Sequence, residues 1–309
     1  MIQPKRLILI IILTAMFALF FFGGPDSQSA RSFKSLWNFG HILFFALFPL
    51  LFLYSRFVSG SYLRQCALAL ASALFLGLMV ELIQGGLNRS PDVGDLFRNM
   101  LGAMVCLFFL SPTRKILSKK HLIILQITTV ILICFQIYGV LTAVADEQMA
   151  RRQFPILSGF ETPFEIQRWS GDADFEIDRR VKRRGKASMR VELNTSTYSG
   201  VSLKYFPEDW EGFNYFQFSI FNPLYETLSI TCRIHDLGHI QGEQKYEDRF
   251  NRTFTIPRGW NTITIRMDDI RSAPVKRRMD IQHIKGVGIF ATRLPRKRII
   301  NIDDVQLLP

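Results

Sequence analysis

The chain has 309 residues, of which 48% are hydrophobic, and its 38 Lys and Arg against 26 Asp and Glu give a net charge of +12. A basic balance of this size favours anionic partners such as lipid headgroups or envelope polymers. No stripe of basic and aromatic residues on a recognised fold accompanies it, so nucleic acid is not an expected partner. Cys66, Cys106 and Cys134 lie within apolar runs and Cys232 is alone in the second half, which excludes a disulfide framework within that half.

The first 145 residues contain apolar runs that predict a bundle of about five transmembrane helices. The first run follows Lys5 and Arg6 and could be a signal peptide, but the further runs behind it favour an uncleaved span. Residues 146–153 are charged and predict a linker to a second domain. The predicted spans cover about residues 7–22, 39–55, 66–83, 96–110 and 121–144.

Lys and Arg in the short loops predict the orientation of these spans. Residues 114–120 place four cationic side chains directly before the last run. We therefore expect the N-terminus in the cytoplasm of a bacterial cell and the second half of the chain outside the cytoplasmic membrane.

The polar stretch between the third and fourth runs carries Glu81, Gln84, Arg89, Asp95 and Asn99. Glu81 and Gln84 are three apart, and Asp95 and Asn99 are four apart, so each pair shares a helix face. Such groups at a membrane edge are usually functional or mutually paired. In a catalytic role, Glu81 or Asp95 could be a general base and Arg89 could hold a phosphate. Helix capping by Asp95 and an ordinary loop position for Arg89 are the structural alternatives.

The pattern E-x-x-Q, then R, then D-x-x-x-N-x-x-G, with a histidine on an earlier run, resembles the VanZ-like membrane family over about residues 1–115. That family is named after a protein of glycopeptide-resistance clusters. It often has an Asp-Lys pair before the histidine, where this chain has Trp37 and Asn38. The resemblance implies a polar site at the membrane edge formed by His41, Glu81, Gln84, Arg89, Asp95 and Asn99.

Residues 154–309 contain short β-rich stretches separated by turns, which predict an extracytoplasmic antiparallel β-sandwich. Polar and apolar residues alternate clearly in 215–221 and 261–267, and no amphipathic helix intervenes. The predicted strands cover residues 187–193, 201–205, 215–222, 228–235, 252–256, 261–267, 284–290 and 299–307.

Several short motifs in this half resemble jelly-roll carbohydrate-binding modules of the galactose-binding-like fold. They include G-F-E at 159–161, G-K-A-S-M-R at 185–190, N-P at 222–223, G-W-N-T at 259–262 and I-D-D at 302–304. In such modules an early glutamate and a late aspartate often meet at a structural calcium, which hard oxygen ligands suit. The resemblance implies a calcium site at Glu161 with Asp303 or Asp304, and no other cofactor.

Sugar binding needs an aromatic platform for the ring and polar groups for the hydroxyls. The candidates fall at turns or outside the alternating core pattern, and packing in the core is the alternative for each aromatic one. The basic run 179–184 is expected to be a solvated hairpin tip, with contact to membrane phosphates or an anionic polymer as the alternative. The candidates for glycan binding are Trp169, Tyr198, Trp210, Tyr246 and Arg249.

No nucleophile elbow or zinc-ligand pattern is present, which disfavours an enzyme in the second half. We therefore expect an integral membrane protein of the cell envelope that binds a cell-wall or lipid-linked glycan, in envelope maintenance or resistance to glycopeptide-type antibiotics. One alternative is a membrane enzyme or transporter that acts on a lipid-linked saccharide through the polar stretch. Another is an assembly factor whose sandwich binds a protein partner.

Overall fold

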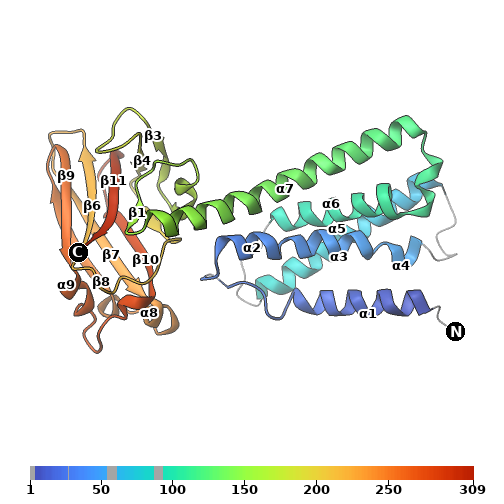
Figure 1. The fold of residues 1–309 in the computed structure, drawn as a ribbon, viewed down its shortest axis with the longest axis horizontal. Coiled ribbons are helices and arrows are strands. Elements are labelled where there is room, and N and C mark those ends of the chain that lie inside the picture. The colour runs from blue at the N-terminus through green and yellow to red at the C-terminus, as the bar shows by residue number, and fades with distance from the viewer. Residues whose placement is uncertain (1–3, 27, 54–60, 87–92) are drawn as a thin grey trace. The chain divides into compact units, whose positions relative to one another are not determined.

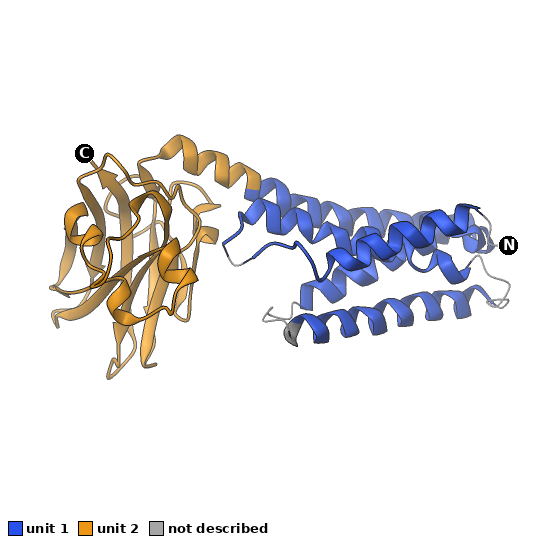
Figure 2. Ribbon diagram, turned by 90° about the horizontal axis from the view of Figure 1, so that it is seen from below, with its two compact units in different colours: residues 1–143 blue, residues 144–309 orange. Residues whose placement is uncertain are grey.

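The computed structural model describes residues 4–26, 28–53, 61–86 and 93–309. The chain divides into two compact units, Met1–Ala143 (unit 1) and Val144–Pro309 (unit 2), which Figure 2 colours separately. Unit 1 is helical and unit 2 consists mainly of strands (Figure 1), in the order that the sequence predicts.

The main helices of unit 1 run in alternating directions (Figure 1), as short connections between apolar helices require. The elements are α1 (Pro4–Leu19), α2 (Arg31–Trp37), α3 (Phe39–Leu47), α4 (Leu50–Leu53), α5 (Tyr62–Gly86), α6 (Val93–Val105), the π-helix η2 (Cys106–Leu110), the 3-10 helix η3 (Pro112–Ile116) and α7 (Lys119–Gln153). The last of these helices, α7, continues beyond Ala143 into unit 2.

Four helical stretches among the described residues are long and apolar enough to cross a membrane. Helix α1 has 16 residues and is not among them, so the first of the five predicted spans remains a prediction. The four stretches are Arg31–Leu53, Tyr62–Gln84, Val93–Leu110 and Lys119–Gln153.

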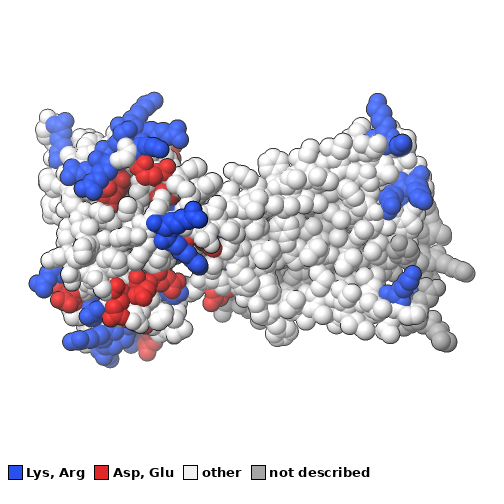
Figure 3. All heavy atoms as spheres, in the orientation of Figure 1, with Lys and Arg blue, Asp and Glu red and all other residues white. Residues whose placement is uncertain are grey.

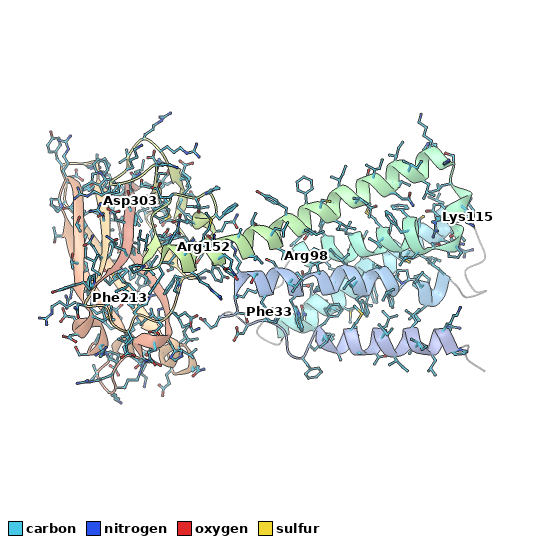
Figure 4. All side chains as sticks on the ribbon, in the orientation of Figure 1. Phe33, Arg98, Lys115, Arg152, Phe213 and Asp303 are labelled. Atoms are coloured by element: carbon cyan, nitrogen blue, oxygen red, sulfur yellow. The ribbon has the colours of Figure 1, made fainter. Side chains whose placement is uncertain are left out.

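The surface of unit 1 is largely uncharged on the face shown in Figure 3, and the Lys and Arg side chains of unit 1 that this face shows lie at one end. Lys115, labelled in Figure 4, lies at that end. Large apolar side chains such as Ile127, Ile131 and Phe135 on α7 are exposed. A helix that exposes such residues to its surroundings suits a lipid environment better than water.

Two glycines allow the helices of unit 1 to approach closely. A Cβ on Gly102 of α6 would lie 2.5 Å from the carbonyl oxygen of Ile42 and 2.8 Å from Cβ of Phe45, both on α3. A Cβ on Gly77 of α5 would overlap the side-chain nitrogen of Asn99 on α6. Small residues at such crossings are typical of packed membrane helices.

Residues 146–153 form the end of α7 and not the predicted linker. The helix continues without a break to Gln153, and unit 2 begins at Val144 within it. No proline or glycine interrupts the sequence from residue 140 to residue 153. Asp146 is 2% exposed and forms an ion pair with Arg168, so this segment is packed against unit 2.

Unit 2 is built of two antiparallel sheets. The first has the order β3-β4-β11-β6-β9 with β1 also paired to β11, and the second has the order β2-β5-β10-β7-β8. The strands are β1 (Ile156–Ser158), β2 (Trp169–Gly171), β3 (Asp174–Asp178), β4 (Ser188–Leu193), β5 (Tyr198–Leu203), β6 (Tyr215–Asn222), β7 (Leu228–Asp236), β8 (Phe250–Ile256), β9 (Gly259–Arg266), β10 (Ile284–Thr292) and β11 (Arg298–Leu308). Short helices connect them: η4 (Glu165–Arg168), α8 (Leu237–Gln241), η5 (Tyr246–Asp248), α9 (Met267–Arg271) and η6 (Ile281–His283).

The core of unit 2 lies between these sheets, as a sandwich requires. Alternate residues of β6, namely Phe216, Phe218 and Ile220, are fully buried, and the same alternation on β10 buries Val287 and Ile289. The antiparallel sandwich and all eight predicted strands are confirmed, whereas β1, β2 and β3 were not predicted. The first two of these have only three residues each, too few to show alternation.

Candidate functional site

A group of polar side chains is buried among the helices of unit 1. Nδ1 of His41 on α3 lies 2.9 Å from Oδ1 of Asn99, and Nε2 of the same ring lies 3.5 Å from Oδ2 of Asp95 on α6. The exposed fractions of His41, Asp95 and Asn99 are 3%, 9% and 1%. The structure therefore brings together three of the six residues predicted to form a polar site.

Two residues that the sequence pattern did not single out extend this group. Arg98 forms an ion pair with Asp95, and its Nε donates a hydrogen bond of 3.2 Å to Oε1 of Gln136 on α7. Arg98 is labelled among the helices in Figure 4. Its spacing of three from Asp95 was an available signal, but Gln136 lies in a run that otherwise reads as apolar. We name His41, Asp95, Arg98, Asn99 and Gln136 the polar helix cluster.

The predicted pair Glu81 and Gln84 lies on α5, and each side chain is 7% exposed. Glu81 follows Gly77 by four residues and so shares the helix face on which Gly77 meets Asn99. Nε2 of Gln84 donates a hydrogen bond of 2.8 Å to the carbonyl oxygen of Phe20. Arg89, also predicted for this site, lies outside the described residues.

An apolar cleft of about 220 Å³ adjoins the polar helix cluster. Phe20 belongs to its wall and also places its ring 4.5 Å from the ring of His41. An apolar space beside buried polar groups can hold the junction between a polar headgroup and an apolar chain. The lining residues are Met16, Leu19, Phe20, Phe33, Leu36, Trp37 and Gly40.

Unit 2 carries a second cleft, of about 320 Å³, on the outer face of the sheet β2-β5-β10-β7-β8. This volume falls within the range of about 300–1,000 Å³ that is usual for small-ligand sites. We name it the sheet cleft, and its lining residues are Gly171, Asp172, Tyr198, Gly200, Val201, Ser202, Arg233, Arg249 and Phe290.

An exposed aromatic ring stands in the wall of the sheet cleft. Tyr198 begins β5 and is 63% exposed. Its ring meets that of Phe290 on β10 edge to face, with centroids 5.8 Å apart and planes at 70°. This contact holds the tyrosine ring in place while leaving a face accessible. The prediction of Tyr198 as a ligand-contacting residue is consistent with this position.

Glycines form much of the floor of the sheet cleft and of the neighbouring sheet surface. A Cβ on Gly171 or on Gly200 would overlap backbone atoms of the adjacent strand. The guanidinium of Arg233 on β7 lies over Gly288 of β10. The ring of His235, also on β7, lies over Gly286 of β10, where a Cβ would be 2.6 Å from Cε1 of the imidazole. The absence of side chains at these glycines of β2, β5 and β10 therefore creates the hollow and lets side chains from β7 lie across it.

Neither predicted tryptophan faces a ligand. Trp210 is fully buried, and its ring stacks on Phe216 with centroids 5.2 Å apart. Trp169 is 5% exposed, and its ring nitrogen donates a hydrogen bond of 3.1 Å to Oγ of Ser158. Both indoles are therefore core residues, because a buried ring has no face to offer a sugar. The turns on which they were predicted are folded back over the core.

The other two predicted residues, Tyr246 and Arg249, lie together beside the sheet cleft. Tyr246 is 71% exposed, and Cζ of Arg249 lies 5.6 Å from the centroid of its ring. Arg249 also lines the cleft. The neighbouring carboxylate of Asp248 pairs with Arg277, at 2.6 Å from its Nε, and not with Arg249.

Arg277 also pairs with a deeply buried carboxylate at the end of β7. Its NH1 lies 2.5 Å from Oδ2 of Asp236, whose side chain is fully buried. Burial acts to raise the pKa of Asp236, but hydrogen bonds from Arg277 and from the backbone N–H groups of Asp280 and His239 outweigh it and lower that pKa. This network closes the sandwich and is a structural feature.

The carboxylates predicted to bind calcium accept backbone hydrogen bonds instead. Oε1 of Glu161 accepts one of 2.8 Å from the N–H of Lys186, and Oδ2 of Asp303 accepts one of 2.7 Å from that of Arg183. Burial raises the pKa of Asp303 and of Asp304. Among the described residues no group of three His, Cys, Asp or Glu side chains could hold a metal ion. The calcium site therefore stays a prediction, and in this structure these carboxylates hold the basic hairpin 179–186.

No family model and no curated protein matches the sequence. Solved structures resemble about half of the chain at low identity. The family 11 carbohydrate-binding module from Clostridium thermocellum in complex with a β-1,3-1,4-mixed-linked tetrasaccharide is 16% identical, with a TM-score of 0.39 over 50% of this chain and 94% of that one. An exo-β-agarase is 15% identical, with a TM-score of 0.40 over 50% and 24%. The family 22 xylan-binding domain of a Paenibacillus barcinonensis protein is 14% identical, with a TM-score of 0.34 over 50% and 98%.

Proposed function

We propose that the chain is an integral membrane protein of the bacterial cell envelope whose β-sandwich binds a glycan through the sheet cleft. The observation that carries this proposal is the exposed ring of Tyr198, which is held by Phe290 above a glycine floor and flanked by Asp172 and Ser202. The ring can stack on the apolar face of a sugar while the carboxylate and hydroxyl bond to its hydroxyl groups. Sugars are the ligands that need both kinds of contact at once.

The membrane assignment is supported by four apolar helical stretches among the described residues. The Lys and Arg side chains at one end of unit 1 favour that end as cytoplasmic. We accordingly propose that unit 2 is extracytoplasmic, where an envelope glycan is accessible to the sheet cleft.

Co-sedimentation of the detergent-solubilised full chain with insoluble cell-wall material tests the proposal. We expect the wild type to sediment with the wall and Tyr198→Ala to remain in solution. Tyr225→Ala is the matched control, because Tyr225 is 84% exposed and does not line the sheet cleft. Sedimentation that is unchanged in Tyr198→Ala, or equally reduced in both variants, would contradict glycan binding at this cleft.

A second candidate function is supported by the polar helix cluster. His41, Asp95 and Asn99 of the cluster are buried among apolar helices, and Nδ2 of Asn99 meets no hydrogen-bond partner among the described residues. Such a group in a membrane is costly unless a ligand completes it. We propose that the cluster and the adjoining apolar cleft hold a lipid-linked saccharide at its headgroup, as the resemblance to the VanZ-like family suggests.

Sensitivity of a bacterial host to a glycopeptide antibiotic tests this second function. We expect expression of the wild type to lower sensitivity and Asp95→Asn or His41→Gln to abolish that effect, with the variants present in the membrane in equal amounts. Equal protection by the wild type and both variants would show that the cluster has only a structural role.

A further inference from the structure

Two arginines beside the floor of the sheet cleft form no ion pair with any carboxylate among the described residues. Arg233 lies on β7 and Arg249 directly precedes β8, and both line the cleft. The Nε atoms of both are buried and make no hydrogen bond within the part of the chain that the structure describes. Burial lowers the pKa of Arg233, and the neighbouring charge of Arg249 lowers it further. Two cations are thus held close together without a counter-charge.

Other polar atoms around these arginines also lack partners. His235 follows Arg233 by two residues on the same face of β7, and Asn251 on β8 pairs with Arg233 across the strands. Nδ1 of His235 and Oδ1 of Asn251 are buried and make no hydrogen bond among the described residues. Burial, with the nearby charges of Arg233, His239 and Arg249, lowers the pKa of His235 to about 4. The imidazole is therefore neutral at pH 7, and the local charge comes from the two guanidiniums.

Several other arginines on the sandwich are paired with carboxylates. Arg190 contacts Glu176 and Arg252 contacts Asp269, while Arg277 bridges two aspartates. A buried guanidinium without an anion is costly, so such groups are normally paired. The exception at the sheet cleft coincides with the surface at which a ligand is proposed to bind.

We infer that the ligand of the sheet cleft is an acidic glycan, whose anionic substituent binds between the guanidiniums of Arg233 and Arg249. This inference rests on the glycan-binding function proposed above and specifies its ligand class. The substituent is a planar carboxylate, as in a uronic acid, or a sulfate or phosphate ester, since guanidinium pairs with all three. The ring that carries it stacks on Tyr198.

The position of Asp172 fits this arrangement. Asp172 directly follows β2, and its Oδ1 accepts a hydrogen bond of 3.3 Å from the N–H of Gly200. Strands β2 and β7 are separated by β5 and β10, which places them about 14 Å apart at the usual strand spacing. The carboxylate therefore faces sugar hydroxyls at one end of the cleft, and the arginines face the anion at the other.

The test measures affinity of the full chain in detergent micelles for matched oligosaccharides that differ only in charge. The pairs are cellohexaose with its C6-oxidised glucuronic acid counterpart and a galactan with the corresponding galacturonan, together with C6-sulfated and C6-phosphorylated cellohexaose. In the pair whose backbone fits the cleft, we expect the acidic oligosaccharide to bind about tenfold more tightly than the neutral one at low salt. Comparison of the oxidised, sulfated and phosphorylated forms identifies which anion the cleft takes.

Variants separate charge recognition from glycan recognition. Arg233→Gln and Arg249→Gln should each weaken acidic binding about tenfold and change neutral binding less than about twofold, and Arg190→Gln serves as a charge-matched control on the opposite sheet. Tighter binding of the neutral member, or equal losses for both members, overturns the inference while the proposed function stands. Binding of no member at any salt concentration contradicts glycan binding itself.

Discussion

Arg168 and Asp146 form an ion pair that is almost completely removed from solvent, with NH2 and Oδ1 2.7 Å apart. The arginine side chain is 0% exposed, and its NH1 also donates a hydrogen bond of 2.8 Å to the carbonyl oxygen of Leu157. Asp146 lies on α7 and Arg168 is the last residue of η4. Together with the hydrogen bond to Leu157, the pair fixes the C-terminal end of α7 to β1.

Removal of one partner of this pair should destabilise unit 2. Arg168→Met leaves a buried carboxylate without its counter-charge, which costs about 3–5 kcal/mol. We expect a matching loss of unfolding free energy in urea titrations followed by tryptophan fluorescence. Asp146→Leu combined with Arg168→Met should recover most of the loss, and a double variant as unstable as the single one would contradict this account.

Replacement of Gly77 should disturb the packing of α5 against α6. Gly77→Ala places a methyl group on the side-chain nitrogen of Asn99, and we expect a lower unfolding temperature in micelles. Gly139→Ala is the matched control, because nothing lies within 4 Å of that position and alanine favours a helix by up to about 1 kcal/mol. If Gly77→Ala combined with Asn99→Ala is no more stable than Gly77→Ala alone, the contact with Asn99 is not the cause.

The two aromatic residues predicted as one platform should behave in opposite ways. Trp210→Ala empties a fully buried site and should cost about 3–5 kcal/mol of folding stability. Tyr198→Ala removes an exposed ring and should change stability by about 0.5 kcal/mol or less while abolishing glycan binding. Urea unfolding and wall binding of both variants distinguish these outcomes, and a large loss of stability in Tyr198→Ala would show that its ring is structural.

Stability should fall in acid because of Asp236. Its pKa is lowered in the folded state relative to that of an exposed aspartate, so its contribution is fully present above the ordinary aspartate pKa and lost as pH falls through the folded pKa. We expect the unfolding temperature of the wild type to drop below about pH 4. Asp236→Asn should be less stable by about 2 kcal/mol at neutral pH and should show a smaller drop. An identical pH profile in the variant would exclude this carboxylate as the cause.

Binding of an acidic glycan should strengthen as the pH is lowered. His235 is neutral in the free protein because its pKa is about 4. Burial and the charges of Arg233, His239 and Arg249 lower that pKa, and Asp236 raises it. An anion beside the ring raises its pKa in the complex, so the complex takes up a proton that the free protein does not. Titration with the glucuronic acid oligosaccharide should show higher affinity as pH falls from neutral towards that value, and His235→Asn should remove the dependence. Affinity that is constant or falls in the wild type would contradict contact between His235 and the anion.

The sequence was informative wherever one periodicity governed a whole element. Alternation in 215–221 located β6 and its core face, and the spacing of Asp95 and Asn99 placed both side chains on one face of α6. The sequence could not distinguish Trp210 from an exposed turn residue, because its burial depends on how the loop before β6 folds its ring onto Phe216. Likewise, Gln136 and Arg233 acquire their surroundings only from contacts with other elements. On β7, Arg233 and His235 alternate with the buried Cys232 and Ile234, and this alternation could have identified Arg233 and His235 as residues of the outer face.

The glycines of β2, β5 and β10 limit how the binding surface can change in evolution. Gly171 and Gly200 face backbone atoms, so even alanine would force neighbouring strands apart. Gly286 and Gly288 lie beneath side chains that could move aside, and any replacement there would make the hollow shallower. Relatives of this protein that keep these glycines should therefore differ in ligand preference through Tyr198, Arg233 and Arg249 at the rim, and not through the depth of the site.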